Sequence, residues 1–140
     1  MGKKLEKSEV CVFFVGIHHK PGKPALCSST ISGKRIDSII GKLGGYKTVK
    51  TNLYPLEHLP KTESDRLTAN SWSVINNPKE GDIIVLLGGI VQKDFKRVKG
   101  CTHINAAHPS LQFSSKRPSE YFDEIVKKIS KATEALTPKE

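Results

Sequence analysis

Val10-Cys-Val-Phe-Phe-Val-Gly16 is an uninterrupted apolar run near the start of this chain of 140 residues. The run is rich in β-branched and aromatic side chains, and it closes on a glycine. A strand with one face in water alternates polar and apolar residues, whereas a strand buried on both faces does not. The run therefore predicts a strand inside a parallel sheet whose two faces are both covered by helices.

Outward from this run, strand-like and helix-like segments alternate along the chain. The expected strands cover residues 10–16, 46–52, 83–87 and 102–106. Thr30 or Ser32 can cap a helix that runs to about Leu43, and further helices are expected at 65–75, 90–98 and 118–135. This order predicts an α/β fold with a four-stranded parallel sheet and right-handed crossovers.

The chain is strongly basic, with 23 lysine and arginine residues against 14 aspartate and glutamate residues and a formal net charge of +9. Such an excess favours a polyanionic partner, with nucleic acid first and an acidic membrane surface second. No run approaches the roughly 18 apolar residues of a spanning helix, and residues 1–9 lack the apolar core of a secretory signal. We therefore expect an intracellular protein, cytoplasmic or nucleoid-associated, with a flexible basic tail at 1–9 and one domain at 10–136.

The three cysteines, Cys11, Cys27 and Cys101, are odd in number and show no CxxC spacing. Neither a disulfide framework nor a zinc site is expected from them. Cys11 and Cys101 lie in or beside apolar strands, where a buried thiol behaves as a small hydrophobe. His103 alternates with core positions and is expected to be a hydrogen-bonded strand histidine, and Trp72 is expected in the core or on a helix surface.

Each expected strand ends in an unusual loop. Thr102-His-Ile-Asn-Ala-Ala-His-Pro-Ser-Leu111 starts as a buried strand and turns at Pro109, which cannot continue the ladder. The other strand ends are Gly16-Ile-His-His19, Thr51-Asn-Leu-Tyr-Pro55 and Leu87-Gly-Gly89. The carboxyl ends of parallel strands share one edge of the sheet, where ligands bind in open α/β folds. Imidazoles, an amide, a hydroxyl and glycines at one edge suit a planar polar heterocycle beside a phosphate.

This set of strand ends resembles the uracil-DNA glycosylase superfamily over residues 12–113. The resemblance rests on His108-Pro-Ser-Leu111 after a buried strand, on Ile84-Val-Leu-Leu-Gly-Gly-Ile-Val-Gln-Lys93, and on Thr51-Asn-Leu-Tyr-Pro-Leu56. It implies a three-layer αβα sandwich whose four strands lie in the order 2-1-3-4. It also implies a DNA partner and a monomeric protein.

The resemblance also implies roles for individual residues. His108 would hydrogen-bond O2 of the base while negative charge develops there, and Asn52 would read the Watson–Crick edge of a flipped base. Leu111 would fill the gap in the base stack. The loop formed by Gly16, Ile17, His18 and His19 would hold the water, with His18 in a catalytic role, and one wall of the pocket. The DNA-contacting residues would be Gly88, Gly89, Lys93, Pro109, Ser110, Leu111, Lys116 and Arg117.

The first of these loops departs from the superfamily pattern. His18 stands where the resemblance implies a water-positioning Asp or Asn, and His19 stands where it implies Pro. No pyrimidine-stacking aromatic residue is evident near Leu26-Cys-Ser-Ser29. Three cysteines cannot supply the four ligands of an iron–sulfur cluster, so no cofactor is expected.

Three functions are consistent with these observations. The first is a glycosylase that excises a deaminated or damaged base, of the uracil or hypoxanthine type. The second is a DNA- or modified-base-binding module on the same fold that has lost hydrolysis, which His18 favours. The third is a flavodoxin-like cofactor domain, against which the absence of a phosphate-binding glycine motif at the first strand counts.

Overall fold

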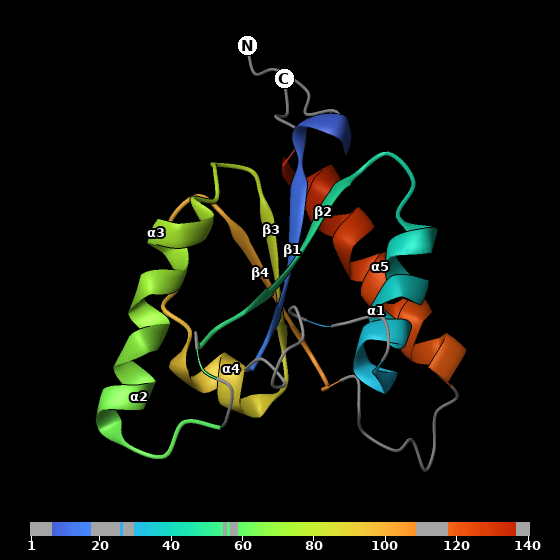
Figure 1. Cartoon of the computed structure of the whole chain (residues 1–140). Helices are drawn as coiled ribbons and strands as arrows, with labels where there is room; N and C mark the ends of the chain where they lie inside the picture. The colour runs from blue at the N-terminus through green and yellow to red at the C-terminus, as the bar shows by residue number, and fades with distance from the viewer. Residues whose placement is uncertain are drawn as a thin grey trace.

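A parallel sheet of four strands forms the centre of the molecule (Figure 1). The strands are β1 Cys11–Gly16, β2 Lys47–Asn52, β3 Ile83–Leu87 and β4 Thr102–Ala106. They lie in the order β2-β1-β3-β4, and every neighbouring pair is parallel. The computed structural model describes residues 7–17, 26, 30–54, 56, 59–108 and 118–136. The α/β class and the strand order are confirmed, and β1 and β2 each begin one residue later than the sequence predicted.

The register of the sheet brings the four strand ends to one level. Gly16 pairs with Asn52 at the end of β1 and β2, and Leu87 pairs with Ala106 at the end of β3 and β4. All five residues of β3 are buried, as expected for an interior strand. β2 is an edge strand in which exposed and half-buried residues alternate, and its lysines discourage pairing with another chain.

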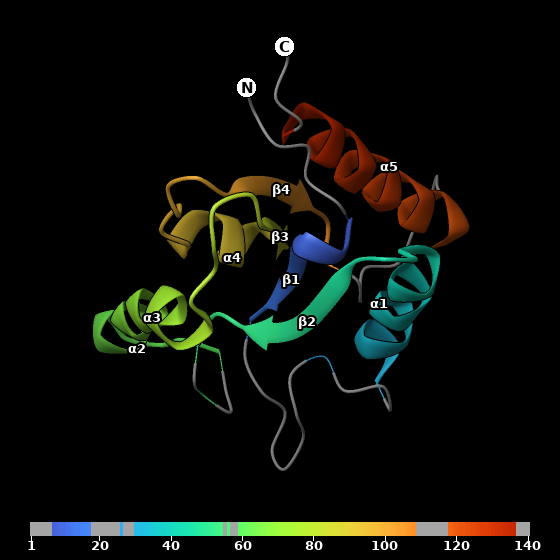
Figure 2. The same cartoon turned by 90° about the horizontal axis from the view of Figure 1, so that it is seen from above.

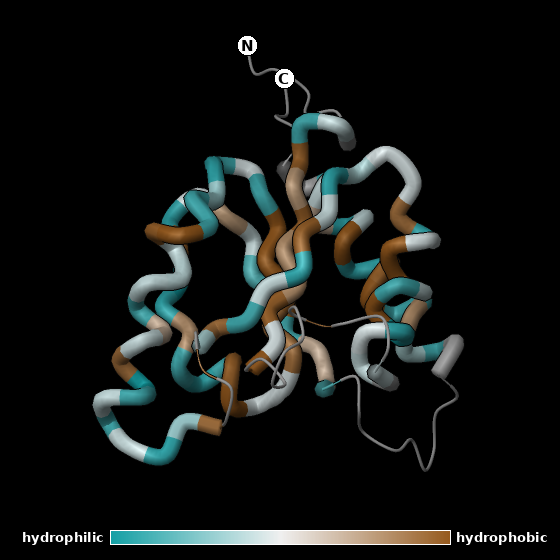
Figure 3. Tube along the Cα trace, viewed as in Figure 1, coloured by the Kyte–Doolittle hydropathy of each residue, from teal (hydrophilic) through white to brown (hydrophobic). Residues whose placement is uncertain are grey.

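Two long helices cover one face of the sheet, α1 Ile31–Lys42 and α5 Pro118–Leu136 (Figure 2). Thr30 caps α1, because its hydroxyl accepts the N–H of Gly33 at 3.0 Å. The hydroxyls of Tyr46 and Thr133 lie 2.6 Å apart and join the start of β2 to α5. The shared core of this face contains Phe14, Val85, Ile36, Ile39, Ile104, Ile125 and Ile129. Figure 3 shows the apolar residues concentrated on the central strands and on the helix surfaces that face them.

Short helices cover the other face of the sheet, where the sequence predicted two longer ones. The expected helix at 65–75 is three segments, namely α2 Glu63–Leu67, the 3₁₀ turn η2 Thr68–Ser71 and α3 Trp72–Asn76. Thr62 starts α2 early through a capping box with Asp65. The hydroxyls of Thr68 and Ser71 then donate to carbonyls three residues back, which favours the tighter 3₁₀ turn.

The expected helix at 90–98 is also shorter, because α4 Gly89–Asp94 ends where Phe95 turns into the core. Phe95 has an extended backbone and is 8% exposed. Its ring centroid lies 5.1 Å from that of Trp72 and 5.8 Å from that of His103, in edge-to-face geometry. A second 3₁₀ turn, η1 Lys7–Glu9, precedes β1. Burial of Phe95 between two aromatic neighbours explains why helical periodicity alone mispredicted this end.

Trp72 and His103 occupy the places expected for core residues. Trp72 is 2% exposed, and its indole N–H donates to the hydroxyl of Thr51 at 2.9 Å. Nε2 of His103 accepts the backbone N–H of Val98 at 2.9 Å, which confirms His103 as a hydrogen-bonded strand histidine. Burial, and then the nearby charge of Arg97, lower the pKa of His103 from its ordinary value. The neutral imidazole is therefore the form that this core accommodates.

Candidate functional site

The ends of β1 and β2 bring Gly16 and Asn52 into close contact. A Cβ atom on Gly16 would lie 2.9 Å from Oδ1 of Asn52 and 3.1 Å from Cδ2 of Leu26, so glycine is what allows the amide to sit there. Beyond the strands, the N–H of Leu53 donates to the carbonyl of Gly16 at 2.9 Å. The N–H of Tyr54 donates to the carbonyl of Ile17 at 3.0 Å. The chain after Asn52 is therefore fastened to the chain that leaves β1.

A second contact of the same kind joins Gly88, after β3, to His108, after β4. Gly88 has a φ of 95° and a ψ of 162°, a backbone conformation that residues other than glycine rarely adopt. A Cβ on Gly88 would lie 3.3 Å from Cβ and 3.5 Å from Cδ2 of His108. The N–H of Gly88 donates to the carbonyl of Ala106 at 2.9 Å, which fixes the two strand ends together.

The backbone just before His108 is held from both faces of the sheet. On the α4 side, Nε2 of Gln92 donates to the carbonyls of Leu86 at 3.2 Å and Ala106 at 3.0 Å. On the α5 side, the hydroxyl of Tyr121 donates to the carbonyl of Ala107 at 2.5 Å. Burial raises the pKa of Tyr121, so its hydroxyl stays protonated and remains a donor. These three hydrogen bonds fix the backbone at the ends of β3 and β4, from which the chain continues to His108.

Tyr54 performs a similar function on the other side of the edge. Its side chain is fully buried, and its hydroxyl donates to the carboxylate of Asp94 at the end of α4. Burial and the hydrogen bond to Asp94 raise the pKa of Tyr54, which keeps the hydroxyl protonated. Tyr54 follows Asn52 by two residues, so this bond anchors the segment that carries Asn52.

Gln92, Tyr54 and Tyr121 were not predicted as site residues. Gln92 and Tyr54 lie within the segments that carry the superfamily resemblance, but nothing in the sequence marks them as anchors. Their partners are backbone carbonyls or a carboxylate from another element, and such contacts have no periodic signature. These contacts can be identified only after the strand order has placed the segments side by side.

Asn52 lies on the face of the sheet that α1 and α5 cover. Lys50, two residues earlier, forms an ion pair with Asp37 of α1, whereas Thr51 between them binds Trp72 on the opposite face. Side chains alternate between the two faces of a strand, so Asn52 shares the face of Lys50. Ile104 and Ala106 of β4 pack in the core of the same face. The amide thus approaches the edge from the side of the long helices.

Seven of the predicted site residues fall in the described part of the chain. Gly16, Asn52, Gly88 and His108 form the two contacts above, and Ile17 accepts the N–H of Tyr54. Gly89 and Lys93 belong to α4 and are exposed. The remaining predicted residues lie outside the described residues: His18, His19, Pro109, Ser110, Leu111, Lys116 and Arg117.

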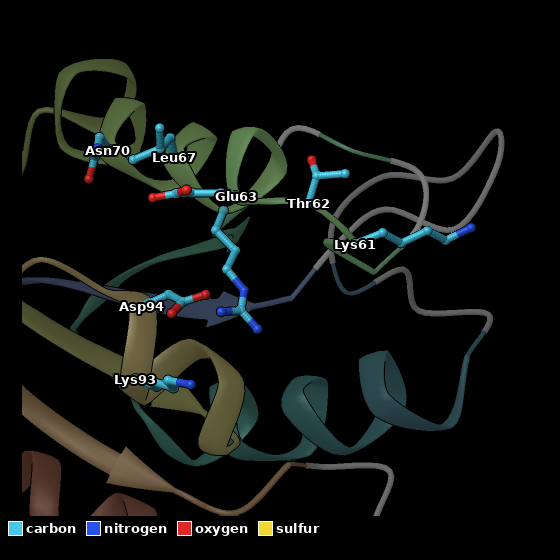
Figure 4. A pocket seen from close by; sticks show the side chains of 8 residues that line it. Lys61, Thr62, Glu63, Leu67, Asn70, Lys93 and Asp94 are labelled. Atoms are coloured by element: carbon cyan, nitrogen blue, oxygen red, sulfur yellow. The ribbon is translucent and has the colours of Figure 1, made fainter.

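A groove between α2 and α4 opens beside this edge (Figure 4). Its volume is about 630 Å³. Glu63 and Leu67 lie on one wall and Lys93 and Asp94 on the facing wall. The full lining consists of Lys61, Thr62, Glu63, Arg66, Leu67, Asn70, Lys93 and Asp94. Only Lys93 of this set was predicted from the sequence.

The opposite, amino edge of the sheet holds two thiols on either side of Asp82. Burial, and then the charge of Asp82, raise the pKa of Cys11 to about 11, and the same two causes raise that of Cys101. Both residues are half-buried. Cys11 precedes Val12 of β1 and Cys101 precedes Thr102 of β4, and both Val12 and Thr102 pair with Ile83 of β3. Two strand spacings place their backbones about 10 Å apart, beyond the roughly 7 Å that a disulfide spans. The distance between their backbones rules out a disulfide between them, and the raised pKa values favour the protonated thiols.

Two properties of the described residues bear on the kind of site. No group of three or more histidine, cysteine, aspartate or glutamate side chains within them is arranged to hold a metal ion. None of the helices formed by these residues is long and apolar enough to cross a membrane. The fold and the edge geometry thus define a doubly wound parallel α/β protein with a polar carboxyl edge. The chain matches no model of a known protein family, and a search of curated proteins finds no match to it.

Proposed function

We propose that this protein is a DNA glycosylase of the uracil-DNA glycosylase type, which flips a deaminated or damaged base out of DNA and excises it. The observation that carries the proposal is the shared edge, where Asn52 and His108 leave β2 and β4 and each lies against a glycine. The uracil or hypoxanthine type of base is the expected substrate. The strand order 2-1-3-4 agrees with what the superfamily resemblance implies.

The width of the edge supports a base as the ligand. β2 and β4 are separated by three strand spacings, about 14 Å between backbones. An asparagine side chain and a histidine side chain that reach inward from either end leave room for one planar ring between them. Gly16 and Gly88 carry no side chains that would occupy this space. The amide of Asn52 can both donate to and accept from a Watson–Crick edge, which a carboxylate or an ammonium group cannot do.

The chemistry assigned to His108 is electrostatic. When uracil is the base, cleavage of the bond between C1′ of the sugar and N1 leaves the bonding electron pair on the base, where the charge spreads onto O2. A water molecule adds to C1′ and loses a proton, and the departing base gains one. A hydrogen-bond donor aimed at O2 stabilises the transition state more than the ground state. Gln92 and Tyr121 hold the backbone before His108, which supports a fixed direction of the His108 donor toward O2.

The charge of the chain supports DNA as the partner. A net charge of +9 on 140 residues favours binding to a polyanion, and neutralised phosphates would release counterions. DNA as a substrate also implies an intracellular site of action, in the cytoplasm or at the nucleoid, and we propose that the protein acts there as a monomer.

The deciding experiment is a cleavage assay on labelled oligonucleotides that contain uracil, hypoxanthine, xanthine or mismatched thymine. Single-turnover excision is followed by alkaline cleavage of the abasic product. Excision of at least one base, lost in Asn52→Ala and retained in Asn105→Ala, is the expected result. Asn105 is the matched control because it is an exposed asparagine in β4. Equal loss in both variants would contradict the assignment of Asn52.

A second function is favoured by His18, which replaces the water-positioning residue that the resemblance implies. In that case the protein binds a modified base or DNA without hydrolysis. The His18→Asp variant separates the two functions in the same assay. If the wild-type protein binds DNA but excises no base while His18→Asp excises one, the protein is a binding module on a glycosylase fold.

A further inference from the structure

The groove between α2 and α4 presents three cationic side chains from two separate elements. Lys61 and Arg66 come from the α2 side, and Lys93 comes from α4. Within the described part of the chain, none of the three forms an ion pair or a side-chain hydrogen bond, although Glu63 and Asp94 line the same groove. Cations that gather without protein partners favour an anionic ligand.

The two carboxylates of the groove do not cancel this charge. Three cations against two carboxylates leave an excess of one positive charge, and the carboxylate of Asp94 already accepts the hydroxyl of the fully buried Tyr54. Glu63 is exposed. Arginine presents a planar set of donors that matches two phosphate oxygens at once, and lysine adds a point charge. Asn70, also in the lining, supplies a neutral donor.

The groove continues the carboxyl edge rather than standing apart from it. Tyr54, the partner of Asp94, follows Asn52 by two residues. α4, which carries Lys93, begins directly after Gly88, the residue in contact with His108. Figure 1 shows α2 and α4 near the end of the sheet to which β1 points. A nucleic acid strand with one nucleotide at the carboxyl edge of the sheet would therefore pass the opening of this groove.

We infer that the groove binds the phosphodiester backbone of the DNA strand that carries the target base, a few nucleotides away from that base. This inference rests on the proposed function, because it takes the edge as the place of the flipped base. The groove, at about 630 Å³, exceeds what one phosphate needs, and its cations stand on both walls, as tracking of a backbone requires. Sequence is not read there, so the contact acts on all DNA alike.

The first test uses DNA length as the variable. Fluorescence anisotropy measures binding of a uracil-containing pentamer and of a uracil-containing 20-mer by wild type, Arg66→Gln and Lys93→Gln across a salt series. On the 20-mer, each variant is expected to bind about fivefold more weakly, and its salt slope is expected to fall by about one. On the pentamer, which is too short to reach the groove, the expected change is less than about twofold. The matched control is Lys131→Gln, an exposed lysine of α5 on the other face of the sheet.

The second test reverses the sign of the effect. Glu63→Gln removes a negative charge from the groove, so the 20-mer is expected to bind about threefold more tightly, with no change for the pentamer. Glu134→Gln, in an exposed part of α5, is the matched control and leaves both affinities unchanged. Opposite changes at Arg66 and Glu63 cannot arise from general loss of stability.

The outcomes separate failure of this inference from failure of the proposed function. If wild type excises a base or binds DNA, but the groove variants bind the 20-mer as wild type does, the inference is overturned and the proposed function stands. Equal losses on pentamer and 20-mer, or a loss in Lys131→Gln of the same size, also overturn the inference. Competition by free deoxyuridine monophosphate that Arg66→Gln abolishes would make the groove a mononucleotide site and overturn it too. If wild type binds no DNA at low salt, both proposals fall.

Discussion

At the amino edge of the sheet a buried carboxylate accepts backbone N–H groups, whereas at the carboxyl edge two polar side chains pack against glycines. Asp82 is 6% exposed, and its two oxygens accept the N–H groups of Cys11 at 3.0 Å and Lys79 at 2.8 Å. At the other edge, Asn52 and His108 pack against Gly16 and Gly88, where an added Cβ atom would lie 2.9 Å and 3.3 Å from them. One edge uses its polar groups to complete the fold, and the proposed function assigns those of the other edge to a base. Substitutions at the first should therefore change stability, and those at the second should change function.

The largest effect is expected at the carboxyl edge, for His108→Ala. Loss of one donor to a developing oxyanion should lower the single-turnover excision rate by about 10²–10³-fold. DNA affinity and the free energy of unfolding should change little. Rapid-quench kinetics and urea denaturation measure the two quantities.

The control for this variant is His103→Gln, which replaces a histidine in the core by a residue that can still accept the N–H of Val98. It should excise at close to the wild-type rate when folded. A His108→Ala protein with an unchanged rate would remove His108 from the site. A variant that unfolds would mean that His108 belongs to the structural edge instead.

The second largest effect is expected at the amino edge, for Asp82→Ala. It leaves the part-buried N–H groups of Cys11 and Lys79 without their acceptor, and a donor that water does not reach costs about 1–3 kcal/mol when it is orphaned. We expect the free energy of unfolding to fall by about 2–4 kcal/mol, measured by urea denaturation.

Glu80→Ala, an exposed carboxylate two positions away, should stay within about 0.5 kcal/mol of wild type. Excision per folded Asp82→Ala molecule should equal that of wild type, because the whole length of the sheet separates Asp82 from Asn52. A reduced excision rate in stable, fully folded Asp82→Ala would show that the two edges are coupled.

A third prediction concerns the two adjacent glycines that begin α4. Gly88→Ala places a side chain at a φ of 95°, which costs about 1–3 kcal/mol, and directs it against His108. Stability and excision rate should therefore fall together. Gly89→Ala meets no atom within 4 Å and should be neutral or slightly stabilising in the helix. Equal behaviour of the two variants in urea denaturation would refute the packing of His108 against Gly88.

The strands were predictable because runs such as 10–16 and 83–87 are apolar without interruption, and only a doubly buried strand needs that pattern. The strand order came from the superfamily resemblance and not from the residues of each strand. The region 65–75 was mispredicted because hydroxyls of Thr68 and Ser71 redirect local hydrogen bonds, an effect that hydrophobic periodicity ignores.

The candidate site was predictable as a set of strand ends, but its internal contacts were not. Asn52 and His108 follow strands, and parallel strands end at one edge. The contact between Gly88 and His108 depends on two segments that are distant in sequence, and the anchors Gln92 and Tyr121 bond to backbone carbonyls. Such pairs carry no signal until the segments are placed together in space.

The smallest expected effect lies in the core between the edges and depends on pH. Burial lowers the pKa of His103 below its ordinary value of 6.5, so the unfolded chain takes up a proton at this residue before the folded protein does. The contribution of His103 to stability is thus complete above pH 6.5 and is lost progressively as the pH falls below that value. His103→Gln has no such titration and keeps an acceptor for Val98. Urea denaturation at pH 7.5 and pH 5.5 should therefore show a smaller loss of unfolding free energy in the variant than in wild type. The two proteins differ only at residue 103, so the difference between them isolates His103. An equal loss in both proteins would mean that the fold does not lower the pKa of His103, contrary to the place of its imidazole between Phe95 and the N–H of Val98.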